Sequence, residues 1–155
     1  MPGAFKRSEM KFLGMLFGLG AVVVAVAAEA SHGAAAPEVW TRKYVMKMIG
    51  EQAAVLEAMV TGLESFDDGV ARMAAAEIAQ LARDLPGLFE VGRPDPFSEA
   101  RPEIWEDFDT FAAQTELLAD LADAASSRIG TIEDLRSAYQ GINETCRSCH
   151  QAYRD

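Results

Sequence analysis

The chain has 155 residues, a formal net charge of −10 at pH 7 and two cysteines. Nucleic acid and anionic membrane surfaces repel so acidic a protein, so the charge favours plain solubility or a basic protein partner. Once an N-terminal segment is set aside, about 125 residues remain, which is enough for one domain with a single hydrophobic core.

The first 30 residues have the features of an export signal. Lys6, Arg7 and Lys11 form a basic start, and residues 12–28 are an uncharged apolar run. Ala28-Glu29-Ala30 then fits the small-x-small pattern at which signal peptides are cleaved. Because the run is slightly long for a signal and slightly short for a membrane span, an uncleaved anchor is the alternative.

These features divide the chain into three parts. We predict a signal peptide at residues 1–30, a flexible neck at 31–37 and a folded domain at 38–155. The signal carries only three of the 14 basic and two of the 24 acidic residues, so the mature part stays strongly acidic. We expect it in the periplasm, or anchored to the periplasmic face of the inner membrane if the signal is kept.

Apolar residues repeat with helical periodicity through the mature part, and no alternating strand pattern competes with them. In the first stretch they are spaced three and four apart, as in a bundle seam: Met46, Ile49, Ala53, Leu56, Val60 and Leu63. Asp67 and Asp68 can cap a second helix, which should end near Pro86-Gly87. Its expected buried face is Val70, Met73, Ala74, Ile78, Leu81 and Leu85.

A segment rich in proline and glycine follows at residues 92–102, long enough to cross over between helices. The third helix begins at Pro102-Glu103, because proline suits the first turn of a helix. It should bury Ile104, Phe108, Phe111, Leu118, Leu121 and Ala125. Gly130 stops it, and Thr131 with Asp134 resembles a capping box that starts the fourth helix.

The fourth helix carries one apolar stripe, formed by Leu135, Ala138, Ile142, Cys146, Cys149 and Tyr153. Four amphipathic helices in sequence predict an all-α fold, an antiparallel four-helix bundle. Both thiols share the stripe that faces the core of this bundle.

The two cysteines belong to the sequence Cys146-Arg147-Ser148-Cys149-His150, a C-x-x-C-H motif typical of covalent c-type haem attachment. Two thiols about one helical turn apart can add to the two vinyl groups on one edge of a porphyrin. The adjacent histidine is then available as the proximal iron ligand. The motif therefore predicts one haem c per chain, held inside the bundle because the macrocycle is apolar.

Other interpretations of the cysteine pair fit less well. A thioredoxin-like C-x-x-C opens a helix after a strand, whereas this pair lies late in a helical segment. A structural zinc site needs four ligands, and beyond the motif the chain offers only His32. A disulfide at this spacing within a helix would be strained.

With C-x-x-C-H after three other helices, the chain resembles the class II c-type cytochromes, the cytochrome c′ family. The matching segments span essentially the whole mature chain: Arg42–Lys47, Asp84–Phe89, Ala100–Trp105 and Cys146–Arg154. The resemblance implies that Arg42 lies near a haem propionate, that Arg154 packs beside the proximal histidine and that Met46 faces the sixth coordination position. Without it, Arg42 is interpreted as a solvated first-turn residue and Arg154 as a partner of the helix dipole.

The family divides at the position of Met46. A non-coordinating side chain there leaves a five-coordinate, high-spin iron that binds NO or CO, whereas methionine permits a six-coordinate, low-spin iron suited to electron transfer. Met48 faces away, and Met59 and Met73 fall on core stripes. The leading expectation is a one-electron carrier with His150/Met46 ligation, and the alternative is a gas-binding protein in which Met46 only lines the distal pocket.

A carrier needs a redox partner, and the acidic charge favours one with a basic docking surface. The resemblance also implies a homodimer through the surface of the first helix. We do not expect an enzyme, because the sequence offers no convergent acid–base pair and no free cysteine for peroxidase or hydrolase chemistry.

Overall fold

The computed structural model describes residues 35–90, 92 and 95–155. The predicted signal peptide, most of the neck and His32 lie outside the described residues. The described part contains four long helices and one single-turn helix: α1 (Pro37–Thr61), α2 (Asp68–Glu90), α3 (Glu103–Glu106), α4 (Phe108–Arg128) and α5 (Ile132–Tyr153). Among these helices, none is both long enough and apolar enough to cross a membrane.

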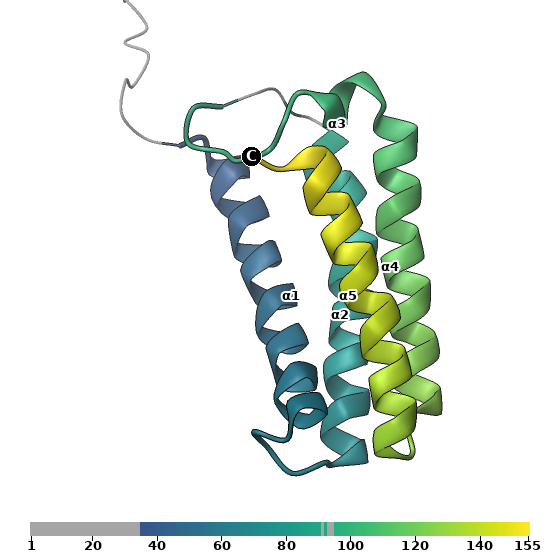
Figure 1. Cartoon of the computed structure of the whole chain (residues 1–155). Helices are drawn as coiled ribbons and strands as arrows, with labels where there is room; N and C mark the ends of the chain where they lie inside the picture. Colours follow the sequence, from purple (N-terminus) through teal and green to yellow (C-terminus); the bar gives the residue numbers. More distant parts are fainter. Residues whose placement is uncertain (1–34, 91, 93–94) are drawn as a thin grey trace, which may run out of the picture. The chain divides into compact units, whose positions relative to one another are not determined.

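The four long helices form an antiparallel bundle, as predicted. Figure 1 shows α1, α2, α4 and α5 running alternately down and up. Around the bundle, α1 packs on α2, α2 on α4, α4 on α5 and α5 on α1. The α2–α4 pair is packed most closely and the α1–α5 pair least closely. The bundle is therefore tight on one side and looser where α1 faces α5.

Alanines explain the close packing of α2 against α4. Both helices bury mostly small side chains, namely Ala71, Ala74, Ala75, Ala79 and Ala82 in α2 and Ala119, Ala122 and Ala125 in α4. Small side chains let two helix axes approach, since ridges and grooves are shallow. The buried face of α2 is the one that carries these alanines, so two residues predicted to be buried are not. Val70 is exposed, and Met73 is 66% exposed. Leu63, expected on the first seam, is 82% exposed beyond the end of α1.

The second helix begins as predicted but ends later. The Asp67 carboxylate accepts a hydrogen bond from the Val70 backbone N–H at 2.9 Å and caps α2. Pro86 lies inside the helix, where its missing N–H costs one helical hydrogen bond. The prediction that α2 stops near Pro86-Gly87 is wrong, because one further turn buries Phe89 in the core.

The predicted third helix is split in two. Asp107, with φ −137° and ψ 63°, interrupts it after the single turn α3. The Asp107 carboxylate then accepts the Thr110 backbone N–H and caps α4. The helices before and after the connection, α2 and α4, are neighbours in the bundle. The described residues 95–102 of this connection lie at the end of the bundle at which α1 begins and α5 ends (Figure 1).

The start of α5 is as predicted. The Thr131 side chain accepts the Asp134 backbone N–H, and the Asp134 side chain accepts the Thr131 backbone N–H, which completes a capping box. The end of α5 is tied to the connection before α3. The Arg101 N–H donates to the Tyr153 carbonyl and the Asp155 N–H donates to the Glu99 carbonyl, both at 3.0 Å. These bonds hold residues 99–101 beside the last turn of α5.

Candidate functional site

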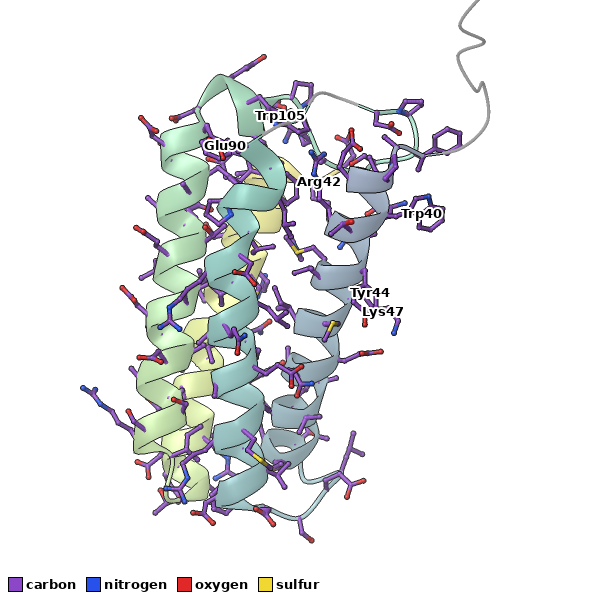
Figure 2. The ribbon with its side chains drawn as sticks, turned by 180° about the vertical axis from the view of Figure 1, so that it is seen from behind. Trp40, Arg42, Tyr44, Lys47, Glu90 and Trp105 are labelled. Atoms are coloured by element: carbon purple, nitrogen blue, oxygen red, sulfur yellow. The ribbon has the colours of Figure 1, made fainter. Side chains whose placement is uncertain are left out.

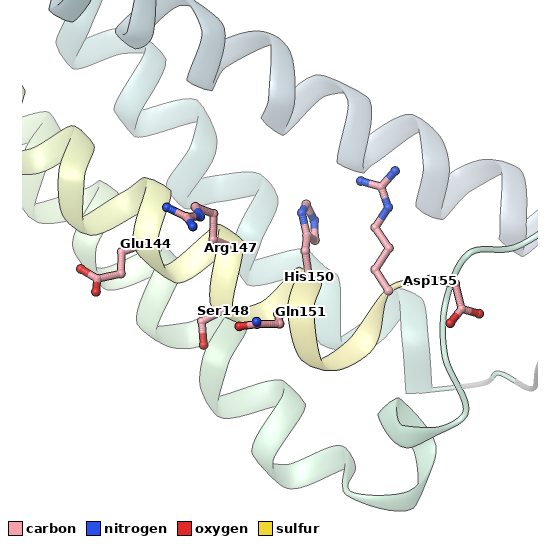
Figure 3. A pocket seen from close by; sticks show the side chains of 7 residues that line it. Glu144, Arg147, Ser148, His150, Gln151 and Asp155 are labelled. Atoms are coloured by element: carbon pink, nitrogen blue, oxygen red, sulfur yellow. The ribbon is translucent and has the colours of Figure 1, made fainter.

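The C-x-x-C-H motif occupies the last turns of α5. Cys146 and Cys149 are half-buried and pack against the hydrophobic core, so both thiols face inward as predicted. His150 is exposed by comparison and projects from α5 toward α1 (Figure 3). Ser148 and Glu144 point away from that side (Figure 3). The helix thus directs the thiols and the imidazole to the loosely packed α1–α5 face.

Two adjoining cavities lie at this face, with volumes of about 340 Å³ and about 260 Å³. Met46, Cys149 and His150 line both of them. The larger is also lined by apolar and cationic residues, including Arg42, Lys43, Lys47, Phe89, Ile104, Phe111, Tyr153 and Arg154. The smaller reaches deeper into the bundle, past Ile49, Leu85, Thr115, Leu118, Ile142 and Cys146.

The residues around these cavities fit a haem c. The combined space falls in the range of about 300–1,000 Å³ usual for small-molecule sites. Its walls are mainly apolar side chains from all four long helices, as a macrocycle requires. Cys146, Cys149 and His150 line the same smaller cavity, so two thiols and a nitrogen donor face one space. Cations line the larger cavity, where propionates would need them.

The protonation of the motif residues is set by their burial. Burial raises the pKa of the Cys146 thiol, and burial together with the neighbouring Cys146 raises the pKa of Cys149 to about 11. Redox-active cysteines of the thioredoxin type show the opposite shift, toward a thiolate. Desolvation, and secondly the charge of Arg154, lowers the pKa of His150, although Glu99 opposes this. A neutral imidazole is the form that binds iron.

Met46 is the methionine that shares the cavities with the motif. It projects from α1, is half-buried and packs against the core. Met48 lines neither cavity. Met59 is buried in the core as predicted, whereas Met73 is exposed rather than filling the core. Of the methionines in the described residues, Met46 alone is placed with Cys149 and His150.

Arg42 is a buried residue and not a solvated one. It is 3% exposed, and its Nε donates a hydrogen bond to the Leu88 carbonyl at 2.8 Å. Its guanidinium lies over the Phe89 ring, 4.8 Å from the centroid, and over the Trp105 ring at 5.6 Å. Burial lowers the pKa of Arg42, although Glu38 and Asp95 act against the shift. Figure 2 shows it pointing inward from α1, while Trp40 and Tyr44 point outward.

Arg154 lies just beyond α5 and also lines the larger cavity. Its side chain is exposed and pairs with the Glu99 carboxylate at 2.6 Å. Its backbone N–H donates to the His150 carbonyl at 3.0 Å, which caps the end of α5. The structure thus places Arg154 one turn from His150 and pairs it with an acidic partner that the sequence did not reveal.

Several cavity residues were missed from the sequence. Phe89 was missed because the helix was expected to stop before it. Trp105 lines neither cavity but contacts Arg42, and no pattern in the sequence indicated that contact. Gln114 and Thr115 also line the deeper cavity, and the Gln114 side-chain oxygen is buried without a hydrogen-bond partner in the described residues. No periodic signal marks these polar residues, since they lie on the same stripe as apolar ones.

Comparison with known proteins gives the family. The family model described as cytochrome C′ matches residues 37–154, which is most of the chain. The chain belongs to the cytochrome c′ family. It is 36% identical over 117 residues to a cytochrome c′ from Rhodopseudomonas palustris, covering 73% of this chain and 78% of the relative. It is also 36% identical over 121 residues to a cytochrome c-556 from Agrobacterium fabrum, covering 77% of this chain and 82% of the relative.

A solved cytochrome c′ from Rhodopseudomonas palustris has the same fold. It superposes with a TM-score of 0.73 at 31% identity and covers 77% of this chain and 97% of the solved one. This cytochrome therefore carries covalently attached haem c in an all-α four-helix bundle. Members of the family are electron carriers or ligand-binding cytochromes and not enzymes of the usual kind.

Proposed function

We propose that this cytochrome is an exported one-electron carrier whose iron is bound by His150 from α5 and by Met46 from α1. Cys146 and Cys149 form the two thioether links to the haem. The bound haem supplies an iron that alternates between ferric and ferrous states, and a thioether ligand favours the ferrous one.

One observation carries the choice of ligands. Met46, Cys149 and His150 line the same two cavities, and Met46 comes from the helix that faces α5. Its sulfur is a soft ligand that suits iron. His32, the other histidine of the chain, lies outside the described residues.

Two arginines support the propionate end of the site. Arg42 and Arg154 line the larger cavity from α1 and from the end of α5. We assign Arg42 to a propionate because its buried charge is held at the cavity wall. Arg154, which is exposed and paired with Glu99, is assigned to the region beside His150.

A second candidate function is the binding of a gas at the iron. Relatives named cytochrome c′ and cytochrome c-556 match this chain at the same identity, so the similarity supports neither ligation over the other. If Met46 only lines the distal side, the iron is five-coordinate and the protein binds NO or CO. A variant cytochrome c prime from Alcaligenes xylosoxidans, of the same fold at 24% identity, has been solved as a nitric oxide complex.

Absorption spectra of the oxidised and reduced holoprotein distinguish the two functions. The carrier should give a low-spin ferric spectrum with a near-infrared sulfur-to-iron band, and it should bind CO slowly or not at all. A high-spin ferric spectrum with rapid CO binding would instead establish the gas-binding function.

Location and partners complete the proposal. Residues 1–30 act as a signal peptide, 31–37 as a neck and 38–155 as the cytochrome domain, which places the protein in the periplasm. The net charge supports a redox partner with a basic docking surface. The mass of the purified native protein tests the export step, since it should begin near Ser31. A mass that includes residues 1–30 would identify an anchored form.

A further inference from the structure

The guanidinium of Arg42 is held by contacts on several sides. Its Nε is bonded to the Leu88 carbonyl, one side faces the Phe89 ring, and the Trp105 ring is also within cation–π distance. An arginine side chain ordinarily has many rotamers, which are costly to restrict. Contacts of this kind leave it little freedom to move away from the cavity wall.

Trp105 is itself fixed to the same turn of α2. Its indole N–H donates a hydrogen bond to the Phe89 carbonyl at 2.8 Å. The last carbonyls of a helix have no partner within the helix, and Leu88 and Phe89 belong to this last turn. Arg42 and Trp105 thus take two consecutive carbonyls at the end of α2. Phe89 supplies both a ring to Arg42 and a carbonyl to Trp105.

Gly92 lets the chain pass close to this pair. A Cβ atom at residue 92 would lie 2.6 Å from the Trp105 indole nitrogen and 2.7 Å from an Arg42 guanidinium nitrogen. Real Cβ atoms do not approach other atoms so closely. Any larger residue at this position would therefore displace Trp105, Arg42 or the backbone between α2 and α3.

We infer that Trp105 is a positioning residue for Arg42, and that through Arg42 it raises the reduction potential of the haem. This rests on the proposed function, in which Arg42 faces a haem propionate. A positive charge close to the haem destabilises the ferric state, which carries one more positive charge than the ferrous state. If Trp105 is removed, Arg42 gains freedom to turn into water, where its charge is screened and acts weakly on the haem.

The test is a double-mutant cycle on the reduction potential of the purified holoprotein. Arg42→Leu and Trp105→Leu should each lower the potential, with the smaller shift in Trp105→Leu. The double variant should show the Arg42→Leu shift and nothing more, because Trp105 acts only through Arg42. Trp105→Phe, which keeps a ring and loses the N–H, should fall between Trp105→Leu and the native protein.

The other tryptophan of the chain is a matched control. Trp40 is 63% exposed and points outward from α1, away from the side on which Arg42 lies (Figure 2), so Trp40→Leu should leave the potential unchanged. Gly92→Ala is a second route to the same effect, since it crowds both partners without altering either side chain. It should lower the potential in the same direction as Trp105→Leu, with the folded helical content retained by circular dichroism.

Two results would overturn the inference. Additive shifts in the double variant would mean that Trp105 affects the haem independently of Arg42. An unchanged potential in Arg42→Leu would mean that Arg42 does not act on the haem charge, so Trp105 has nothing to position. The iron ligands are read separately from the sulfur-to-iron band of the same samples, so a failure of this inference is distinguishable from a failure of the His150/Met46 assignment.

Discussion

Whether Met46 binds the iron distinguishes the two proposed functions. Substitution Met46→Leu removes the sulfur and keeps nearly the same volume, so the fold should lose less than about 1.5 kcal/mol. The ferric iron should become high-spin, the potential should fall because the thioether is lost, and CO should bind readily. Visible and near-infrared spectra with CO titration check this.

Met48 provides the matched control for Met46. It is two residues away on the same helix and does not line either cavity, so Met48→Leu should leave the spectrum, the potential and the CO response unchanged. If Met46→Leu also leaves them unchanged, the sixth ligand is not Met46.

The two cysteines should hold the haem through stable covalent bonds. Acid-acetone should therefore fail to extract haem from the mature native protein, and should extract it from a Cys146→Ala/Cys149→Ala variant. The double variant should also unfold at a lower temperature, because a cofactor that binds only the folded state stabilises it. Cys149→Ala alone keeps one thioether, so its haem should resist extraction. Complete extraction from the native protein would contradict covalent attachment.

At the scale of single residues, the sequence predicts the site where the chemistry is local. Cys146, Cys149 and His150 are neighbours along one helix, so their spacing alone indicates their joint use. Arg42 is different, since its burial depends on Phe89 and Trp105, which come from the end of α2 and from α3. Contacts between distant segments leave no periodic pattern, and the resemblance to a family was needed to single Arg42 out.

Helix ends depend on small motifs that can be tested separately. Thr131 caps α5 through its hydroxyl, so Thr131→Ala should reduce the free energy of unfolding by about 1 kcal/mol. Ser137, exposed in the interior of the same helix, is the control, and Ser137→Ala should change stability by only a few tenths of a kcal/mol. Urea unfolding of the two variants compares their free energies of unfolding. Equal losses in both variants would mean that the effect comes from substitution by alanine and not from loss of the cap.

The capping box also makes stability depend on pH. Hydrogen bonds from the Thr131 side chain, and secondly from the Gly130 backbone, lower the pKa of the Asp134 carboxyl in the folded state. The contribution of the Asp134 carboxylate to the free energy of unfolding is therefore fully present above its unfolded pKa of about 3.9. It is lost as the pH falls through the lower pKa of the folded state. The stability difference between native protein and Asp134→Asn should be constant near neutrality and shrink below about pH 4. A difference that grows in acid would contradict this.

At the scale of helices, the sequence predicts the number and order of elements better than their faces and ends. The period of apolar residues indicates each helix, but many alanines in α2 make two neighbouring faces nearly equal in hydrophobicity. The face of α2 that is buried is the one that packs against α4, because the buried alanines of α4 allow close contact there. Likewise Pro86 would end an isolated helix, yet burial of Phe89 favours one more turn.

In the described part of the chain, two exposed aromatic side chains lie together on α1. Trp40 and Tyr44 are 63% and 61% exposed and lie one turn apart on the outer side of α1 (Figure 2). We expect this surface to form the homodimer, because large exposed aromatic side chains favour association. Tyr44→Glu should shift the protein toward monomer in sedimentation velocity. Leu117→Glu, on the exposed side of α4, should not. A native protein that stays monomeric at all concentrations would contradict this use of α1.

The unequal packing around the bundle also determines how the protein moves. Segments with few buried contacts open more often than those in the tight core, so backbone amides on the α2–α4 side should exchange with deuterium most slowly. The α1–α5 side should open first, since these two helices contact each other least. We therefore expect α1 to move away from α5 before attachment, so that an incoming haem can reach the thiols of α5. The α2–α4 pair should stay packed during this step.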